Sequence, residues 1–348
     1  MDKVRVAIAG ATGYGGVELV RTLGGHPGVE LVYLSSESYA GQQICDVYPH
    51  LPARLPELRA LSASEAAQAA EVVFLGLPHG KAVEHTPALL GAGCRVLDLS
   101  ADFRLRDPAA YPQWYGWEHG APKLLAEAVY GLPELYRERL RAARLIAVAG
   151  CYPTGTLLAL APALRQGLIA PEGIVVDAKS GVSGAGRTAL KLDFHFPEAN
   201  EDMCAYKVAG HQHTPEIEQE ASALAGTPVT LTFTPHLAPM TRGLLVTAYG
   251  RLAGQVDTAQ ALAAYREFYA GERFVRVLPE GMLPHTRSVA GSNYAHVSVR
   301  VDARTHTLIM ISAIDNLGKG QALQAVQCLN AACGFPEETA LEQPGYYP

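Results

Sequence analysis

A glycine-rich segment near the N-terminus constrains this chain more than any other feature. The segment Gly10-Ala11-Thr12-Gly13-Tyr14-Gly15-Gly16 follows an apolar run at residues 4–9 and precedes a helical pattern at 17–23. A strand, a turn without Cβ atoms and a helix N-terminus let backbone N–H groups approach a pyrophosphate. The segment therefore predicts dinucleotide binding by Gly10, Thr12, Gly13, Tyr14, Gly15 and Gly16. The alternative is a turn used only for close helix–strand packing.

Short apolar runs alternate with helical patterns through the first 150 residues. The predicted strands are 4–9, 30–34, 72–75, 96–99 and 145–148, and the predicted helices between them include 17–23 and 66–70. Runs this short and apolar are typical of strands buried on both faces, so we expect an α/β fold with a doubly wound parallel sheet.

The pattern changes after Cys151. In the predicted strand 295–301, Val297, Val299 and Val301 alternate with polar residues, which indicates a mainly antiparallel sheet with one solvated face. Other strands are expected at 174–178, 229–234, 244–249, 274–278 and 308–314, and helices at 156–166, 258–269 (with Asp257 as N-cap) and 321–333. The second half is therefore expected to be an α+β domain.

Composition and charge exclude several classes of partner. The 348 residues are 49% hydrophobic and 18% charged, with a net charge of −6, so neither nucleic acid nor an anionic membrane is an expected partner. No apolar stretch is long enough to cross a bilayer, and the N-terminus runs straight into a strand pattern, without a signal peptide. The six cysteines contain no CxxC pair, which favours a reducing compartment such as the cytoplasm and argues against a metal cluster.

One cysteine stands where a nucleophile is expected. Gly150-Cys151-Tyr152-Pro153-Thr154 links a predicted strand to a long apolar helix, and proline suits a first helical turn. A helix N-terminus stabilises a thiolate and offers N–H donors to an oxyanion. We therefore interpret Cys151 as the catalytic nucleophile. The other five cysteines, Cys45, Cys94, Cys204, Cys328 and Cys333, are expected to be buried structural residues.

Two histidines and three arginines complete the candidate chemistry. His211 and His213 precede a helix, and either could exchange a proton with the substrate; a zinc site lacks further well-spaced ligands. Arg104, Arg187 and Arg242 lie in small-residue loops and suit an anionic substrate, because guanidinium groups bind phosphate and carboxylate bidentately.

The far end of the dinucleotide is expected after the second strand. Ser35 and Ser36 favour a 2′-phosphate, whereas the carboxylate of Glu37 would favour a free 2′-hydroxyl, so the residues leave both cofactors open. Pro78 follows the third strand at the same sheet edge, where the cofactor should also lie.

The motifs together resemble the N-acetyl-γ-glutamyl-phosphate reductase family of the aspartate-semialdehyde-dehydrogenase-like group. The resemblance covers essentially the whole chain. It rests on the glycine segment, residues 98–104 (DLSADFR), 150–154 (GCYPT), 180–187 (SGVSGAGR), 211–217 (HQHTPEI), 239–243 (PMTRG) and 315–319 (DNLGK).

The resemblance implies a Rossmann domain at 1–150 plus 315–348, and a catalytic and oligomerisation domain at 151–314. It implies Cys151 as nucleophile, His211 as acid/base with His213 beside it, and Asn316 near the nicotinamide; Ser180 belongs to one of its most diagnostic segments and is a candidate for substrate binding. The implied reaction is NADPH-dependent reduction of the small-molecule acyl phosphate N-acetyl-γ-glutamyl phosphate to the semialdehyde, in arginine biosynthesis, by a homodimer or homotetramer.

Two positions depart from the family pattern. Glu37 stands where relatives often carry a residue more favourable to a 2′-phosphate. After Lys319 the chain reads Gly-Gln-Ala-Leu-Gln (residues 320–324), where relatives usually carry a smaller Ala/Gly run. Three alternative functions are weighed: the analogous reductase of carrier-bound aminoadipyl phosphate in lysine biosynthesis, a cysteine hydrolase or acyltransferase, and a dinucleotide-sensing protein without catalysis.

Overall fold

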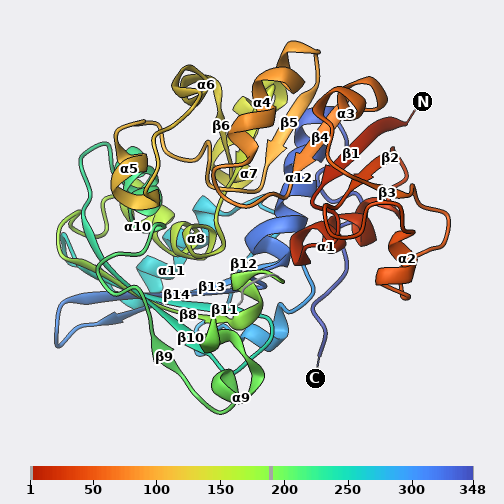
Figure 1. Ribbon diagram of the computed structural model, residues 1–348. Helices are drawn as coiled ribbons and strands as arrows, with labels where there is room; N and C mark the ends of the chain where they lie inside the picture. Colours follow the sequence, from red (N-terminus) through yellow and green to blue (C-terminus); the bar gives the residue numbers. More distant parts are fainter. Residues whose placement is uncertain (1–2, 188–190, 348) are drawn as a thin grey trace. The chain divides into compact units, whose positions relative to one another are not determined.

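The structure is a computed structural model that describes residues 3–187 and 191–347, and it divides into two compact units (Figure 1). Of the described residues, unit 1 contains 3–149, 186–187 and 321–342. Unit 2 contains 150–185, 191–320 and 343–347.

Unit 1 is built on a parallel sheet, which has seven strands within the described residues. The strand order is β3-β2-β1-β4-β5-β7-β6, and every pair of neighbours is parallel. The strands are β1 (Val4–Ala9), β2 (Val29–Ser35), β3 (Leu58–Arg59), β4 (Val72–Leu75), β5 (Arg95–Asp98), β6 (Val129–Gly131) and β7 (Leu145–Val148). The central strands are buried along almost their whole length, as the apolar runs predict.

Two groups of helices pack on this sheet. One group contains α1 (Tyr14–Leu23), α7 (Pro133–Ala142) and α12 (Leu323–Cys333), and the other contains α3 (Ala63–Ala69) and α4 (Ala82–Gly91) (Figure 1). The shorter helices are α2 (Ile44–Val47), α5 (Ala110–Tyr115) and α6 (Pro122–Glu127). The doubly wound arrangement predicted from the alternating pattern is confirmed, with α12 supplied by the end of the chain.

Unit 2 contains a mixed sheet, again with seven strands in the part of the chain that is described. Its order is β12-β13-β14-β11-β8-β10-β9, with two parallel pairs, β12–β13 and β8–β10, and antiparallel pairs elsewhere. The strands are β8 (Ile174–Gly181), β9 (Cys204–Ala205), β10 (Leu231–Ala238), β11 (Leu244–Arg251), β12 (Val275–Val277), β13 (Ala295–Asp302) and β14 (Thr307–Ile314). The mainly antiparallel sheet is therefore confirmed.

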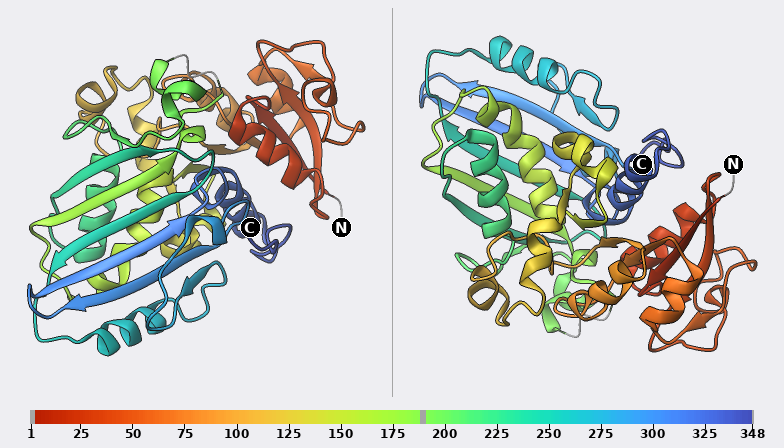
Figure 2. Two further views of the ribbon diagram at one scale, coloured as in Figure 1. Left: turned by 90° about the horizontal axis from the view of Figure 1, so that it is seen from below. Right: turned by 90° about the horizontal axis from the view of Figure 1, so that it is seen from above.

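Three long helices cover one face of this sheet: α8 (Cys151–Arg165), α10 (Thr214–Ala225) and α11 (Thr258–Phe268) (Figure 2). Burial alternates along the strands, so that Val176 and Ala178 are buried on this side while Val175 is exposed. Asp257 caps α11 through a capping box with Gln260, as predicted for the N-cap. The remaining elements are η1 (Val182–Ala185), η2 (Leu192–Phe194), α9 (Phe196–Ala199), η3 (Thr286–Ser288) and a π-helix, η4 (Gly318–Ala322).

Several boundaries differ from the sequence expectations. Helix α8 begins at Cys151 rather than at residue 156, and the C-terminal helix starts as the π-helix η4 before α12. Residues 315–320 and 343–347 cluster with unit 2, while 186–187 cluster with unit 1. These segments owe their place to long-range side-chain contacts, which the local sequence pattern does not encode.

Some single-residue expectations were wrong. All six cysteines are free thiols, but only Cys94 and Cys328 are buried; Cys204 is exposed, and Cys45 and Cys333 are half-buried. Cys204 is exposed because β9 is a two-residue strand at the sheet edge. Among the described residues, no helix is both long and apolar enough to cross a membrane.

Candidate active site

The thiol of Cys151 lies at the first residue of α8. Gly150 is the N-cap, with extended backbone (φ −67°, ψ 158°), and the Thr154 N–H donates to the Gly150 carbonyl over 2.8 Å to close the first turn. Cys151 is half-buried, whereas every residue of α8 from Tyr152 to Leu164 is buried. A half-exposed sulfur at a helix N-terminus has the electrostatic environment that stabilises a thiolate.

Gly320 leaves the space that Cys151 occupies. A Cβ atom at position 320 would lie 2.8 Å from the Cys151 Cβ and 3.1 Å from the Asp315 carbonyl oxygen. A side chain here would press on the nucleophile itself. Gly320 therefore has a steric role beside Cys151.

A buried carboxylate holds the residue before the nucleophile. Glu216, in the first turn of α10, accepts a hydrogen bond from the Gly150 N–H over 2.9 Å and is fully buried. The sequence analysis missed this residue. The sequence does contain one indication: Glu216 follows Thr214-Pro215 directly, and carboxylates are common in the first turn of a helix.

His211 and His213 share an aromatic cluster with Tyr152. The two imidazole centroids are 4.8 Å apart, and the Tyr152 ring lies 5.5 Å from His211 and 5.9 Å from His213. The His213 backbone N–H donates to His211 Nδ1 over 3.1 Å. Because a backbone N–H can only donate, Nδ1 accepts, and the proton of the neutral ring sits on Nε2.

His211 is buried, and its pKa reflects that. Burial lowers the pKa of His211 to about 3, and the positive charge of Lys207 acts in the same direction. At neutral pH, His211 is therefore a neutral imidazole with a donor at Nε2. The sequence predicted the two histidines as a pair but left their protonation open.

Two tyrosine hydroxyls continue this cluster. Tyr206 donates to the Tyr152 hydroxyl over 3.3 Å, and Tyr152 donates to the His236 carbonyl over 3.1 Å. Burial raises the pKa of both phenols, while a hydrogen bond with Ser180 lowers that of Tyr152. Both tyrosines therefore remain protonated, and Ser180, at the end of β8, belongs to the same region of unit 2.

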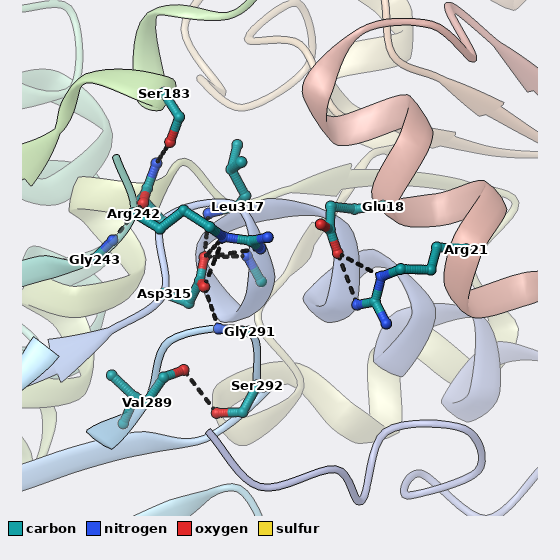
Figure 3. A network of polar contacts seen from close by, with 12 residues as sticks. Glu18, Arg21, Ser183, Arg242, Gly243, Val289, Gly291, Ser292, Asp315 and Leu317 are labelled. Carbon is teal, nitrogen blue, oxygen red and sulfur yellow. Dashed lines mark hydrogen bonds and ion pairs between the residues drawn. The ribbon is translucent and has the colours of Figure 1, made fainter. Parts of the chain in front are cut away.

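Arg242 is held by a buried carboxylate (Figure 3). Its Nε lies 2.9 Å from Asp315 Oδ2, and the Asp315 side chain is fully buried while that of Arg242 is 22% exposed. Asp315 also accepts backbone N–H groups from Leu317 and Gly318, each over 2.8 Å, and from Gly291. The ion pair fixes the position of a guanidinium group in unit 2.

Asn316 ties the same turn to two glycine-rich loops. Its Oδ1 accepts the Gly243 N–H over 2.8 Å, and its Nδ2 donates to Ser183 Oγ over 2.9 Å. Gly243 has φ +115°, a conformation that favours glycine, and a Cβ there would lie 2.8 Å from the Thr286 Cβ. The motifs PMTRG, SGVSGAGR and DNLGK therefore meet in unit 2.

The predicted dinucleotide loop of unit 1 leaves room only for backbone. Gly10 has φ +77°, and a Cβ there would lie 2.2 Å from the Gly76 carbonyl oxygen; a Cβ on Gly16 would lie 2.1 Å from the Gly10 oxygen. Gly13 is the N-cap of α1, so the loop opens directly into a helix N-terminus. These features fit a pyrophosphate held by N–H groups.

The segment after β2 approaches this loop through hydroxyl groups. Ser36 Oγ lies 2.7 Å from Thr12 Oγ1, and the Ala11 N–H donates to the Ser35 carbonyl over 2.9 Å. Glu37 Oε1 accepts the Leu61 N–H over 3.1 Å. The carboxylate that made cofactor choice ambiguous in the sequence is thus bound to the backbone at residue 61.

The two other predicted arginines both contact unit 1. Arg104 is buried and donates from Nε to the Val148 carbonyl (2.8 Å) and from Nη2 to the Leu99 carbonyl (3.0 Å). Arg187 donates from Nη1 to the Thr12 carbonyl, over 3.1 Å. The described contacts thus place these arginines with the strand ends and glycine loop of unit 1.

Buried carboxylates organise the loop that carries Arg104. Asp102 accepts the N–H groups of Gly80 (2.7 Å) and Val83 (3.0 Å), which links it to the segment containing Pro78. Burial raises the pKa of neighbouring Asp98 to about 7, and Asp102 adds to the effect.

Comparisons with known proteins agree with this arrangement. The family described as semialdehyde dehydrogenase, NAD binding domain, matches residues 5–143, and that described as semialdehyde dehydrogenase, dimerisation domain, matches residues 151–316. Aspartate semialdehyde dehydrogenase II of Vibrio cholerae, complexed with ASA, superposes with a TM-score of 0.75 at 17% identity, over 96% of this chain and 99% of that one. An aspartate semialdehyde dehydrogenase with NADP from Candida albicans gives a TM-score of 0.71 at 16% identity, over 95% and 98%. The chain is therefore an oxidoreductase of the semialdehyde dehydrogenase class.

Curated relatives narrow the class. N-acetyl-gamma-glutamyl-phosphate reductase of Symbiobacterium thermophilum is 55% identical over 98% of both chains. The reductase of the same name from Desulforamulus reducens is 51% identical, over 99% of this chain and 100% of the relative. The chain belongs to the N-acetyl-γ-glutamyl-phosphate reductase family.

Proposed function

We propose that the protein reduces N-acetyl-γ-glutamyl phosphate with NADPH, giving N-acetylglutamate 5-semialdehyde and phosphate in arginine biosynthesis. The observation that carries the proposal is the half-exposed Cys151 thiol at the N-terminus of α8. The names of relatives at 55% and 51% identity over nearly the full chain support the choice of substrate. The six free thiols suit a reaction in a reducing compartment such as the cytoplasm.

The covalent step follows from the position of the sulfur. The Cys151 thiolate attacks the acyl carbon, the carbon–oxygen bond to phosphate breaks, and phosphate leaves with the electron pair. When bound, the nicotinamide supplies the hydride that converts the thioester to the aldehyde level. The resulting oxyanion collapses, the carbon–sulfur bond breaks, and Cys151 leaves as the thiolate.

His211 serves as a neutral donor in this proposal. With Nδ1 occupied by the His213 N–H, its Nε2–H can donate to the carbonyl oxygen as negative charge develops there. The lowered pKa of His211 keeps the ring neutral, which makes it a weak base toward Cys151 but a good donor to an oxyanion.

Unit 2 supplies the groups for the substrate anion. We assign the carboxylate of the substrate to Arg242, whose guanidinium is fixed by Asp315, with Ser180 and His213 as neighbouring polar groups. Arg104 donates to backbone carbonyls, and we assign it the shaping of the loop that follows β5.

Unit 1 supplies the groups for NADP(H). Gly10 and Gly16 let the backbone of the loop pack closely, and Gly13, the N-cap of α1, has no atom within 3.4 Å of the place of a Cβ, which favours a pyrophosphate at this helix N-terminus. We assign further cofactor contacts to Thr12, Gly13, Tyr14, Gly15 and Pro78 of this unit, and the contact near the nicotinamide to Asn316 of unit 2. Ser35 and Ser36 favour the 2′-phosphate, since the competing carboxylate of Glu37 is bound to Leu61.

The test is the reverse reaction with semialdehyde, phosphate and NADP⁺, followed through NADPH formation. We expect phosphate-dependent turnover and a loss of about 10⁴-fold or more in Cys151→Ala, because this variant lacks the sulfur on which the proposed thioester forms. Cys204→Ala, which removes an exposed thiol of the same unit, should retain activity. Unchanged activity in Cys151→Ala would defeat the proposal.

The same assay separates the rival functions. Faster turnover of an aminoadipyl substrate would favour the lysine-pathway reductase, and ester cleavage without nucleotide would favour a hydrolase. Tight cofactor binding without hydride transfer would favour a sensing protein. Nucleotide-dependent turnover of the N-acetylglutamyl compound that exceeds turnover of the aminoadipyl substrate excludes all three as the main activity.

We further propose that the protein forms a homodimer or homotetramer through the sheet face of unit 2 opposite α8, α10 and α11. On that face, Val175, Tyr249 and Ile309 stand directly opposite one another on β8, β11 and β14. Val175 is 40% exposed and Tyr249 38%, an apolar row on a solvated sheet. The matched family's description as a dimerisation domain supports this choice.

Sedimentation velocity tests the oligomer. Val175→Glu should shift the protein toward monomer, because a charge would be buried in the interface. Phe196→Ser, which changes an exposed apolar residue outside the sheet, should leave the oligomer intact. A monomeric parent protein would contradict the proposal.

A further inference from the structure

Arg187 was predicted to bind the substrate, but it lies with unit 1 and not with the proposed substrate groups of unit 2. Residues 186–187 cluster with unit 1, although the preceding residues, 150–185, cluster with unit 2. The guanidinium contacts the predicted cofactor loop: Nη1 donates to the Thr12 carbonyl over 3.1 Å. A cation has thus been brought to the nucleotide loop from a distant part of the sequence.

The second contact of Arg187 is with the segment that follows β2. Its Nη2 donates to the Tyr39 hydroxyl over 3.1 Å, and its Cζ lies 5.2 Å from the Tyr39 ring centroid. The Tyr48 ring lies 5.0 Å away, and the Tyr48 hydroxyl donates to the same Thr12 carbonyl over 2.8 Å. Two tyrosines and one carbonyl therefore hold the guanidinium in place.

This position joins the glycine loop to the segment after β2, where the sequence predicts the adenosine ribose. The Thr12 side chain lies 2.7 Å from Ser36 Oγ, so the residue whose carbonyl binds Arg187 also contacts the hydroxyl after β2. In Rossmann folds the ribose 2′ position is recognised at the end of the second strand, by a carboxylate for a free hydroxyl or by a nearby arginine for a 2′-phosphate. Here Glu37 is bound to the Leu61 N–H.

We infer that Arg187 recognises the 2′-phosphate of NADP(H) together with Ser36 and Thr12, and so sets the preference for NADPH over NADH. The inference rests on the proposed cofactor and deepens it. The guanidinium supplies a charge-assisted donor to a phosphate that NADH lacks, and the two tyrosines fix its orientation before the cofactor arrives.

The test measures binding of adenosine 2′,5′-bisphosphate and adenosine 5′-monophosphate by calorimetry, which requires neither substrate nor turnover. We expect Arg187→Ala to weaken the bisphosphate by about 10- to 100-fold and to change the monophosphate by less than about twofold. Arg187→Lys should fall between, because it keeps the charge but loses the planar fork. The bisphosphate affinity of the parent should also fall more steeply with salt than that of Arg187→Ala.

Arg141→Ala is the matched control. It removes the same charge from the same unit at an exposed pair with Glu138, and it should leave both affinities unchanged. Retained monophosphate binding by Arg187→Ala shows that the loop is folded; if that variant does not fold, Arg187→Lys gives the decision alone.

Equal losses for both nucleotides, or no loss for the bisphosphate, would overturn the inference. These outcomes are separate from the reductase assay. If the parent discriminates the bisphosphate through Arg187 but does not turn over the semialdehyde, the proposed function fails and the inference stands. If turnover with NADPH holds and the affinities are unchanged in Arg187→Ala, only the inference fails.

Discussion

The glycine loop of unit 1 and the turn around Asp315 in unit 2 position functional groups in opposite ways. In the loop, close backbone packing sets the shape, because neither Gly10 nor Gly16 has space for a Cβ. The turn works by burying charge: Asp315 is fully buried, binds Arg242 and accepts three backbone N–H groups. One site is shaped by sterics, the other by electrostatics.

This difference predicts which substitutions each site tolerates. A steric site should fail when any atom is added and should be insensitive to charge. An electrostatic site should fail when a charge is removed, even if the shape is kept, because its partners remain buried without compensation. Four substitutions sharpen or break this contrast.

Asp315→Asn should have the largest effect. It keeps the shape but leaves the partly buried Arg242 without its counter-charge, and we expect a loss of about 3 to 5 kcal/mol in the free energy of unfolding. Asp302→Asn, which removes one partner of the exposed pair with Arg304, should have a much smaller effect, because solvent screens that pair. Denaturant titration measures both, and equal losses would remove the distinction between the two pairs.

Gly10→Ala should come next. A positive φ and a Cβ only 2.2 Å from the Gly76 oxygen should lower the free energy of unfolding by at least about 2 kcal/mol. Gly13→Ala is the paired variant, since its φ is −71° and its Cβ would lie 3.5 Å from the nearest atom. We expect it to keep its stability to within about 1 kcal/mol and to lose nucleotide affinity instead. Similar melting of the two variants would contradict the steric account.

Gly320→Ala tests whether the two principles meet at the nucleophile. The added Cβ would lie 2.8 Å from the Cys151 Cβ, so we expect about 1 to 3 kcal/mol of destabilisation and a fall in kcat of about 10- to 100-fold. Gly254→Ala has no atom within 4 Å of its added Cβ and should leave kcat unchanged. An unchanged kcat in Gly320→Ala would show that Cys151 tolerates displacement.

The smallest effect is expected in the pH dependence of His211→Asn. The folded-state pKa of His211 is about 3, and its unfolded value is 6.5, so below pH 6.5 the unfolded chain takes up a proton that the folded chain does not. The free energy of unfolding of the parent should therefore fall relative to that of His211→Asn as the pH is lowered from 7 to 5. The limiting slope is about 1.4 kcal/mol per pH unit. Asp98 titrates in both proteins and cancels in the difference. A flat difference would mean that His211 is protonated in the fold.

The same contrast explains how much the sequence could predict. The glycine loop, the parallel strands and the helix that follows Gly150 are local patterns, and they were found. Glu216 contacts Gly150 across 66 residues, and Asp315 meets Arg242 across 73, so neither partnership has a local signal. His26 is buried and bonds to Asn330, 304 residues away, which the sequence around it does not indicate. Arg187 was predicted as a candidate for binding an anionic substrate, and its contacts with Thr12 and Tyr39 depend on the path of the chain.

The central claim is that the acyl group of the substrate is bound to the sulfur of Cys151 as a thioester during the reaction. One pre-steady-state measurement tests this claim directly. The enzyme is mixed with the semialdehyde and NADP⁺ without phosphate, and NADPH formation is followed together with the mass of the peptide that contains Cys151. The account predicts a burst of about one NADPH per chain, an N-acetylglutamyl adduct on that peptide, and release of the adduct on addition of phosphate. NADPH formation with no adduct, or an adduct on another cysteine, would contradict it.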